Sequence, residues 1–214
     1  MNPCHARTSR TVSHRRWSTY AAALAGACVA MLPALSAHAL TPPAVPIDVE
    51  VPTGHKLFRL EHAVGTQNYV CRTIATPPGF AWAPFGPQAT LFTNYGRQTA
   101  THFLSPNPDE GGLARPTWQD SRDTSSVWAM QDGIFSDPPF VDPDAIPWLR
   151  LRVVGAEPGP TGGGRITRAG YLQRLNTSGG KAPTTGCSED SHVGGKALVP
   201  YTADYLFYRA TGQD

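Results

Sequence analysis

Residues 201–209 read Tyr-Thr-Ala-Asp-Tyr-Leu-Phe-Tyr-Arg and alternate with a period of two. In an extended chain the odd-numbered positions from Tyr201 to Phe207 share one face, because side chains alternate across a β-strand. Residues 147–154 repeat the pattern, with three aliphatic residues facing one way while Trp148, Arg150 and Arg152 face the other. Both stretches therefore predict strands with one buried face.

Five further segments are rich in aromatic and β-branched residues: 67–75, 89–93, 99–104, 126–130 and 166–175. Gly, Pro, Asn and Asp separate them, and the chain has 21 Gly and 21 Pro. After residue 39, no window longer than ten residues keeps a helical period without a Gly or Pro. The pattern predicts an all-β, single-domain β-sandwich or barrel with long Pro/Gly-rich loops, at 105–115 and 178–200.

The first 39 residues have the layout of a secretory signal peptide. Four arginines and no acidic residue precede an apolar run over 20–32, and Ala37-His38-Ala39 supplies the small residues of a cleavage site. We expect cleavage near Ala39 and an extracytoplasmic location, periplasmic or secreted. The apolar run is too short to span a bilayer, so no transmembrane span is expected. Residues 40–54, with three early prolines, predict a Pro-rich tether before a β-domain at 55–214.

Without the leader, the charge balance is slightly acidic. The chain has 18 basic residues, and removal of the four leader arginines leaves 14 against 16 acidic ones. A nucleic-acid surface would need clustered Lys and Arg. No nucleic-acid partner is therefore expected.

Two of the four cysteines, Cys71 and Cys187, lie outside the leader. An even pair in an oxidising compartment is most simply a disulfide, which would close a loop of more than a hundred residues. A metal site would need further ligands nearby, and neither cysteine belongs to a CxxC pair. The other alternative is an unpaired catalytic thiol, which oxidation would threaten.

Several motifs of catalysis and cofactor binding are missing from the sequence. It has no GxSxG, HExxH or CxxC, and its Gly-rich stretches lack the spacing of a dinucleotide or phosphate loop. No cofactor is therefore expected, ATP and NAD included.

The strongest candidate for chemistry is His102, on a predicted strand before a Pro/Gly loop. A fold that brought Asp120 or Asp132 to its ring would make it a base or a metal ligand. The alternative is a hydrogen-bonded strand histidine without catalytic role. Asp132 also belongs to a run of four aspartates that extends to Asp144. This run lacks the pattern of a calcium loop and is better explained as solvated turns, so no metal site is expected.

Aromatic residues offer a second kind of site. Trp118 and Trp148 belong to a large set of aromatic residues in this chain. If these rings are exposed, they would stack on sugar rings or line an apolar cavity; if they are buried, they would fill the core. Trp148 shares its strand face with Arg150, so that face is either solvated or a polar binding surface.

Six segments, in this order, resemble the family called domain of unknown function 3455, which comprises exported proteins of fungi and bacteria. They are 65–71 (GTQNYVC), 101–103 (THF), 116–118 (PTW), 145–149 (AIPWL), 171–180 (YLQRLNTSGG) and 199–208 (VPYTADYLFY). The resemblance covers residues 50–210. It implies an exported protein with a disulfide, and it implies no established reaction.

The resemblance adds Arg174 and Asn176 to the candidate ligand-binding residues, since both lie in its most specific segment. We expect an exported, non-enzymatic binding or surface-associated domain for a small molecule or polysaccharide, carbohydrate or lipid-like. One alternative is an extracytoplasmic hydrolase or metal-dependent enzyme centred on His102, and another is a structural envelope protein. These hypotheses differ in whether His102, Trp118, Arg174 and Asn176 converge in one concave site.

Overall fold

The computed structural model describes residues 40–212, so the predicted signal peptide lies outside the described residues. Eight strands follow one another along the chain: β1 His55–Ala75, β2 Pro78–Phe92, β3 Gln98–Asn107, β4 Leu113–Asp120, β5 Ser126–Phe135, β6 Trp148–Glu157, β7 Tyr171–Gly179 and β8 Lys196–Ala210. Three short 3-10 helices accompany them: η1 Ile47–Val49, η2 Pro108–Glu110 and η3 Asp190–His192. Within the described range, no helix is long and apolar enough to cross a membrane.

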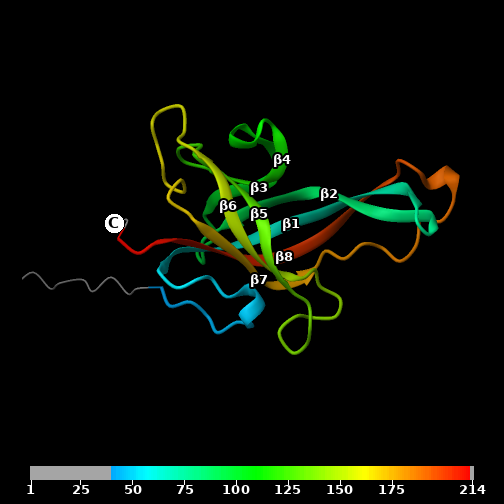
Figure 1. Cartoon of the computed structure of the whole chain (residues 1–214), viewed down its shortest axis with the longest axis horizontal. Helices are drawn as coiled ribbons and strands as arrows, with labels where there is room; N and C mark the ends of the chain where they lie inside the picture. The colour runs from blue at the N-terminus through cyan, green and yellow to red at the C-terminus, as the bar shows by residue number, and fades with distance from the viewer. Residues whose placement is uncertain (1–39, 213–214) are drawn as a thin grey trace, which may run out of the picture. The chain divides into compact units, whose positions relative to one another are not determined.

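The strands form one closed antiparallel barrel (Figure 1). Each strand pairs with the next along the chain, and β8 returns to pair with β1. The prediction of an all-β fold, with a barrel as one of its two forms, is confirmed. The inward face expected for β8 is also confirmed, because the residues at odd positions from Tyr201 to Phe207 belong to the buried core.

The first strand is long enough to serve two purposes. Its earlier part closes the barrel between β2 and β8, whereas its end continues with β2 as a hairpin that extends beyond the barrel (Figure 1). At Gly65 the neighbouring strand comes very close, since a Cβ there would lie 2.2 Å from the Gln88 carbonyl oxygen. Any larger residue would push β1 and β2 apart.

The loops are shorter than the sequence suggested. The segment 105–115, expected to be a loop, instead holds the end of β3, the helix η2 and the start of β4. Strand β4 was missed because it contains Pro116 and little alternation. The prolyl ring is tolerated there because β4 pairs with β5 only over Thr117–Gln119, so Pro116 has no partner on that side.

Apolar residues pack on both sides of the barrel wall. The inner core contains alanine, larger aliphatic and aromatic residues, and all eight strands contribute to it. A second cluster lies outside, where Val49 of η1 packs with Trp148, Leu206 and Tyr208. Within this outer cluster Gln173 of β7 links η1 to β8, donating from Nε2 to the Val49 carbonyl at 2.6 Å and accepting from the Tyr208 hydroxyl at 2.6 Å. Part of the segment 40–54 is thus fixed to the wall.

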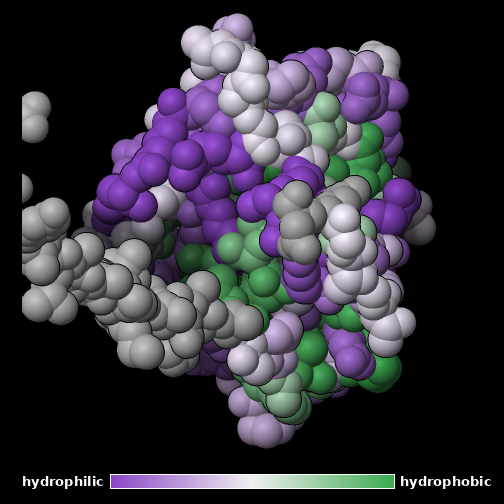
Figure 2. Space-filling model, turned by 90° about the vertical axis from the view of Figure 1, so that its left-hand side faces the viewer, coloured by the Kyte–Doolittle hydropathy of each residue, from purple (hydrophilic) through white to green (hydrophobic). Residues whose placement is uncertain are grey.

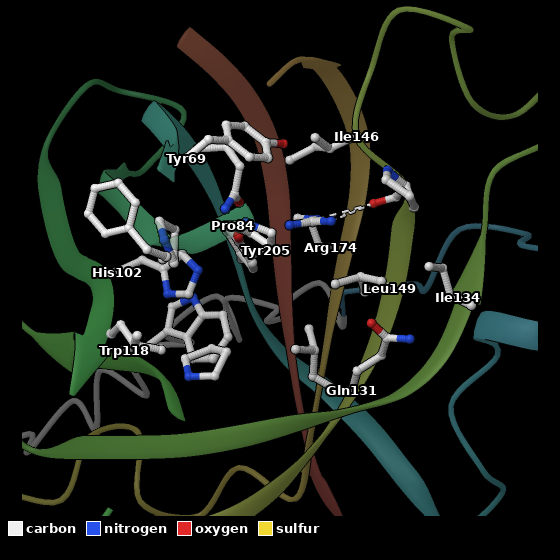
Figure 3. A pocket seen from close by; sticks show the side chains of 18 residues that line it. Tyr69, Pro84, His102, Trp118, Gln131, Ile134, Ile146, Leu149, Arg174 and Tyr205 are labelled. Carbon is white, nitrogen blue, oxygen red and sulfur yellow. Dashed lines mark hydrogen bonds between the residues drawn. The ribbon is translucent and has the colours of Figure 1, made fainter. Parts of the chain in front are cut away.

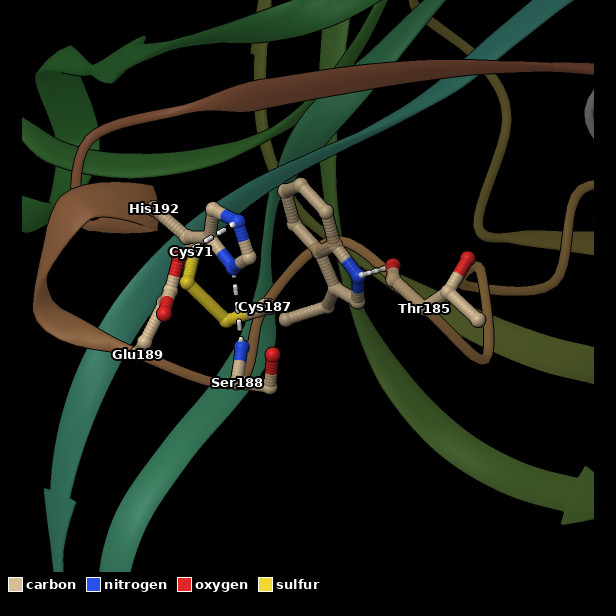
Figure 4. The surroundings of a disulfide bond; sticks show 7 residues. Cys71, Thr185, Cys187, Ser188, Glu189 and His192 are labelled. Atoms are coloured by element: carbon tan, nitrogen blue, oxygen red, sulfur yellow. Dashed lines mark hydrogen bonds and ion pairs between the residues drawn. A yellow bond between two sulfur atoms is a disulfide. The ribbon is translucent and has the colours of Figure 1, made fainter.

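The predicted disulfide between Cys71 and Cys187 is confirmed, with their Cα atoms 5.4 Å apart (Figure 4). Cys71 lies on the part of β1 that extends beyond the barrel, and Cys187 lies in the segment before η3. The same segment is held by a hydrogen bond that Trp82 Nε1 donates to the Thr185 carbonyl at 3.0 Å. Backbone hydrogen bonds also join Cys71 to Gly194 and Gly195. The covalent bond therefore ties the β7–β8 connection to the hairpin.

One end of the barrel interior is charged. Glu61 and Asp120 are 1% and 2% exposed, and Arg59 lies between them. Arg59 forms an ion pair with Glu61 and a second one with Asp120 at 2.6 Å, and it also donates to the Thr99 carbonyl. Hydrophilic residues cover much of the molecular face that carries residue 40 (Figure 2). Along β1, the ion pairs of Arg59 come first, the apolar layer at Ala63 comes next, and the candidate site comes last.

Candidate functional site

A cavity of about 440 Å³ opens in the barrel (Figure 3), and Gln67 and Tyr69 of β1 belong to its lining. This volume falls in the range of small-molecule sites. Its walls are mainly apolar and aromatic: Phe85, Leu104, Trp118, Ile134, Ile146, Leu149, Leu151 and Tyr205, with four prolines at positions 84, 87, 116 and 147. Proline rings keep one backbone dihedral fixed, so much of the wall is rigid.

Arg174 is the cationic side chain of this lining. Its Nε and Nη2 donate to the Pro147 carbonyl at 3.2 and 2.9 Å, a contact drawn as a dashed line in Figure 3. Within residues 40–212, no carboxylate forms an ion pair with Arg174. A half-buried guanidinium without a counter-ion is unusual, because charges removed from water are normally paired.

His102 also lines the cavity and is 3% exposed. Its Nδ1 lies 2.9 Å from the Thr117 carbonyl oxygen. Since a carbonyl only accepts, Nδ1 carries the proton. Burial and, to a smaller extent, the charge of Arg174 lower the pKa of His102 to about 3, although the hydrogen bond with Thr117 opposes the shift. At neutral pH the ring is therefore uncharged, and the lone pair is on Nε2.

Two tyrosines place hydroxyl groups at the cavity. The Tyr69 hydroxyl donates to the Gly180 carbonyl at 2.7 Å, fixing the start of the β7–β8 connection. Tyr205 packs edge-on against the rings of His102 and Trp118. Burial raises the pKa of both tyrosines, and Arg174 opposes this shift in each. Both hydroxyls are therefore neutral hydrogen-bonding groups at physiological pH.

The described lining contains no Asp, Glu, Lys, Ser, Thr or Cys. Among those side chains, none serves as an activated nucleophile of the usual kinds, and none is a carboxylate that would orient His102. Nor does the described range 40–212 contain a cluster of three metal-ligating side chains. The cavity's chemistry is that of one cation, one neutral imidazole and a few neutral donors in an apolar enclosure.

The two aspartates considered as partners of His102 make their contacts elsewhere. Asp120 faces the barrel interior but binds Arg59, and its other oxygen accepts from the Arg122 backbone at 2.8 Å. Asp132 accepts from Arg150 Nε at 3.2 Å. Neither forms a hydrogen bond with the His102 ring.

The candidate ligand-binding residues divide into two groups. Trp118 and Arg174 line the cavity together with His102. Trp148 packs in the outer cluster, and Arg150 donates to the Glu50 carbonyl outside the barrel. Asn176 is exposed, and its Nδ2 donates a hydrogen bond to Asp204 Oδ2 at 2.8 Å.

Sequence reasoning did not single out Tyr69, Leu149 or Gln131 as site residues, although all three line the cavity. Leu149 was predictable, because it was assigned to the strand face opposite Trp148. Of the four prolines in the lining, only Pro147 lies in a segment that the sequence predicted as a strand. The inward position of Pro87 was predictable, because Pro87, Ala89 and Leu91 are alternate residues of β2 and therefore share one face of the strand.

The fold and the cavity define a class: an eight-stranded antiparallel barrel with a cavity of about 440 Å³. The chain belongs to the family described as a protein of unknown function (DUF3455), whose model matches residues 52–209. Neither a curated protein nor a solved structure matches the chain.

Proposed function

We propose that this protein binds a small, mainly apolar molecule in the barrel cavity without transforming it, outside the cytoplasm. The observation that carries the proposal is the cavity of about 440 Å³ with rigid apolar walls and a few neutral polar groups. Ligand sites in other barrels have this composition. The disulfide and the leader sequence support an oxidising, extracytoplasmic compartment.

A lipid-like or other apolar small molecule is favoured over a polysaccharide. Sugar binding at a surface would need exposed aromatic platforms, whereas Trp118, Trp128 and Trp148 are all buried. Tyr95 is 98% exposed, but it has no ring contact with another aromatic residue of the described range. The cavity in the barrel is the better match to the aromatic residues of this chain.

The enzymatic alternative depends on His102, which does line the cavity. A general base works best when its pKa is near the working pH, and a pKa of about 3 leaves the imidazole a weak base. We expect hydrolysis of 4-nitrophenyl butyrate to be no faster with the wild type than with His102→Asn. A wild-type rate clearly above that of the variant would favour the enzyme.

Binding is tested by thermal unfolding in the presence of 2-naphthoate, 2-naphthamide or maltohexaose. A ligand that binds the folded state at a hundred times its Kd stabilises by about 2.7 kcal/mol. We expect at least one naphthyl probe to raise the unfolding midpoint and maltohexaose to leave it unchanged. If neither naphthyl probe raises the midpoint, the proposed function is wrong.

A cavity-filling variant assigns the effect to this site. Leu149→Trp places a large ring in the cavity, whereas Leu113→Trp adds the same ring at a position that is 52% exposed. We expect the first variant to lose the stabilisation and the second to keep it. Equal stabilisation of both would place the probe elsewhere.

A further inference from the structure

The cavity lining has an unbalanced positive charge. Arg174 is its cation, His102 is neutral, and no acidic residue of the described range lines it. A guanidinium in a partly desolvated, apolar enclosure is stabilised by an anion, and the lining does not provide one. The missing counter-charge is therefore a property to look for in the ligand.

The geometry of the guanidinium leaves its outer edge available. The carbonyl of Pro147 accepts from Nε and Nη2, which form one edge of the planar group. Five N–H groups are present in all, and the Tyr205 hydroxyl also forms a hydrogen bond with the guanidinium, so donors remain on the edge formed by Nη1 and Nη2 for a ligand to share with Tyr205. Two parallel donors match the two oxygens of a carboxylate.

We propose that the ligand of this cavity is a small carboxylate with an apolar body, whose carboxylate pairs with Arg174. This inference rests on the proposed binding function and names its ligand class. The apolar body lies against Leu104 and Leu149 of the lining. A phosphate monoester is disfavoured because its second negative charge would find no partner in the lining. A cationic ligand is disfavoured by Arg174 itself.

The test compares two probes of nearly the same size and shape. 2-Naphthoate carries a carboxylate, and 2-naphthamide carries a neutral amide in its place. We measure the Kd of each for the whole folded protein by isothermal titration calorimetry. We expect 2-naphthoate to bind roughly ten- to a hundredfold more tightly, the range of a charge-assisted hydrogen-bonded contact.

Three variants assign the preference to the guanidinium. Arg174→Gln removes the charge and should make the two Kd values equal within about threefold, because the contacts to the naphthyl ring are shared. Arg174→Lys keeps a charge but not the fork, and should retain part of the preference. Arg152→Gln removes an exposed arginine from β6 and should retain all of it. Circular dichroism verifies that each variant is folded.

The outcomes separate this inference from the function on which it rests. Equal binding of both probes to the wild type would overturn the carboxylate assignment and leave the binding function standing. Failure of both probes to bind would overturn both. A preference that persists undiminished in Arg174→Gln would overturn the role of Arg174.

Discussion

The imidazole of His102 lies flat against the indole of Trp118, with ring centroids 4.0 Å apart and planes inclined by 12°. The two residues are opposite each other on β3 and β4. Tyr205 closes the cluster edge-on, 5.1 Å from the His102 centroid. A charged imidazolium would lose its hydration in this stack, so the folded protein holds His102 neutral.

This burial predicts a loss of stability at acidic pH. The pKa of His102 is 6.5 in the unfolded chain and about 3 when folded. Between these values the unfolded state binds one proton more than the folded state, so stability falls as the pH falls. The slope from this group is about 1.4 kcal/mol per pH unit, and it vanishes above about pH 7.

Urea unfolding between pH 4 and 7.5 measures that slope. Other groups titrate in the same range, so the quantity of interest is the difference between wild type and His102→Asn, which keeps a donor for the Thr117 carbonyl. We expect a shallower pH dependence in this variant. His192→Asn, at a half-buried position outside the cavity lining, is the control variant. Identical slopes in wild type and His102→Asn would show that His102 protonates in the folded state.

The disulfide should contribute strongly to stability, because Cys71 and Cys187 are separated by 116 positions in the chain. In the chain-entropy account, a loop of this length stabilises the folded state by about 4–5 kcal/mol, less any strain. We expect reductant to lower the urea midpoint of the wild type. The double variant Cys71→Ala/Cys187→Ala should already have the lower midpoint and should not respond. A wild-type midpoint that stays constant after both thiols have been alkylated would contradict this expectation.

Gln173 should hold the N-terminal segment to the barrel wall. In Gln173→Leu, the Val49 carbonyl and the Tyr208 hydroxyl both lose a partner at buried positions. We expect a loss of about 1–3 kcal/mol in unfolding free energy and faster proteolysis within residues 45–51. Gln88→Leu, an exposed position on β2, is the matched control. Cleavage at the same rate in both variants would mean that other contacts hold the segment, such as its apolar packing and the hydrogen bond from Arg150 to the Glu50 carbonyl.

Period-two alternation made the inner faces of β8 and β6 predictable, because the middle of the barrel is filled by apolar side chains. Leu151 and Phe207 are therefore in the core where the pattern placed them. The disulfide was predictable from the number of cysteines and the compartment. In both cases the physical signal is local or is a simple count.

The site was only partly predictable, because its residues meet through strand register. Arg174 reaches the cavity because it is paired with Tyr205 on β8 and Leu149 on β6. Nothing in the segment around Arg174 indicates that register, and Asn176, two positions later, is exposed outside the barrel. A bulge between Leu175 and Ser178 interrupts the alternation there. The charged layer, formed by Arg59, Glu61 and Asp120, was not predictable either. Glu61 points into the barrel interior, where hydrophobic patterning predicts apolar residues.

The charged layer yields the most severe stability prediction. In Arg59→Met, Glu61 and Asp120 would keep their buried positions without the guanidinium between them. Removing one partner of a buried ion pair usually costs about 3–5 kcal/mol, because the remaining charge stays desolvated. We expect a loss of this size in urea unfolding, against little change for Arg72→Met on the exposed part of β1.

A triple variant separates buried charge from lost packing in this layer. Adding Glu61→Gln and Asp120→Asn to Arg59→Met makes both remaining side chains neutral at nearly constant volume. If desolvated charge causes the loss, the triple variant should recover a substantial part of the unfolding free energy. No recovery would mean that Arg59 acts through its packing and its bond to the Thr99 carbonyl.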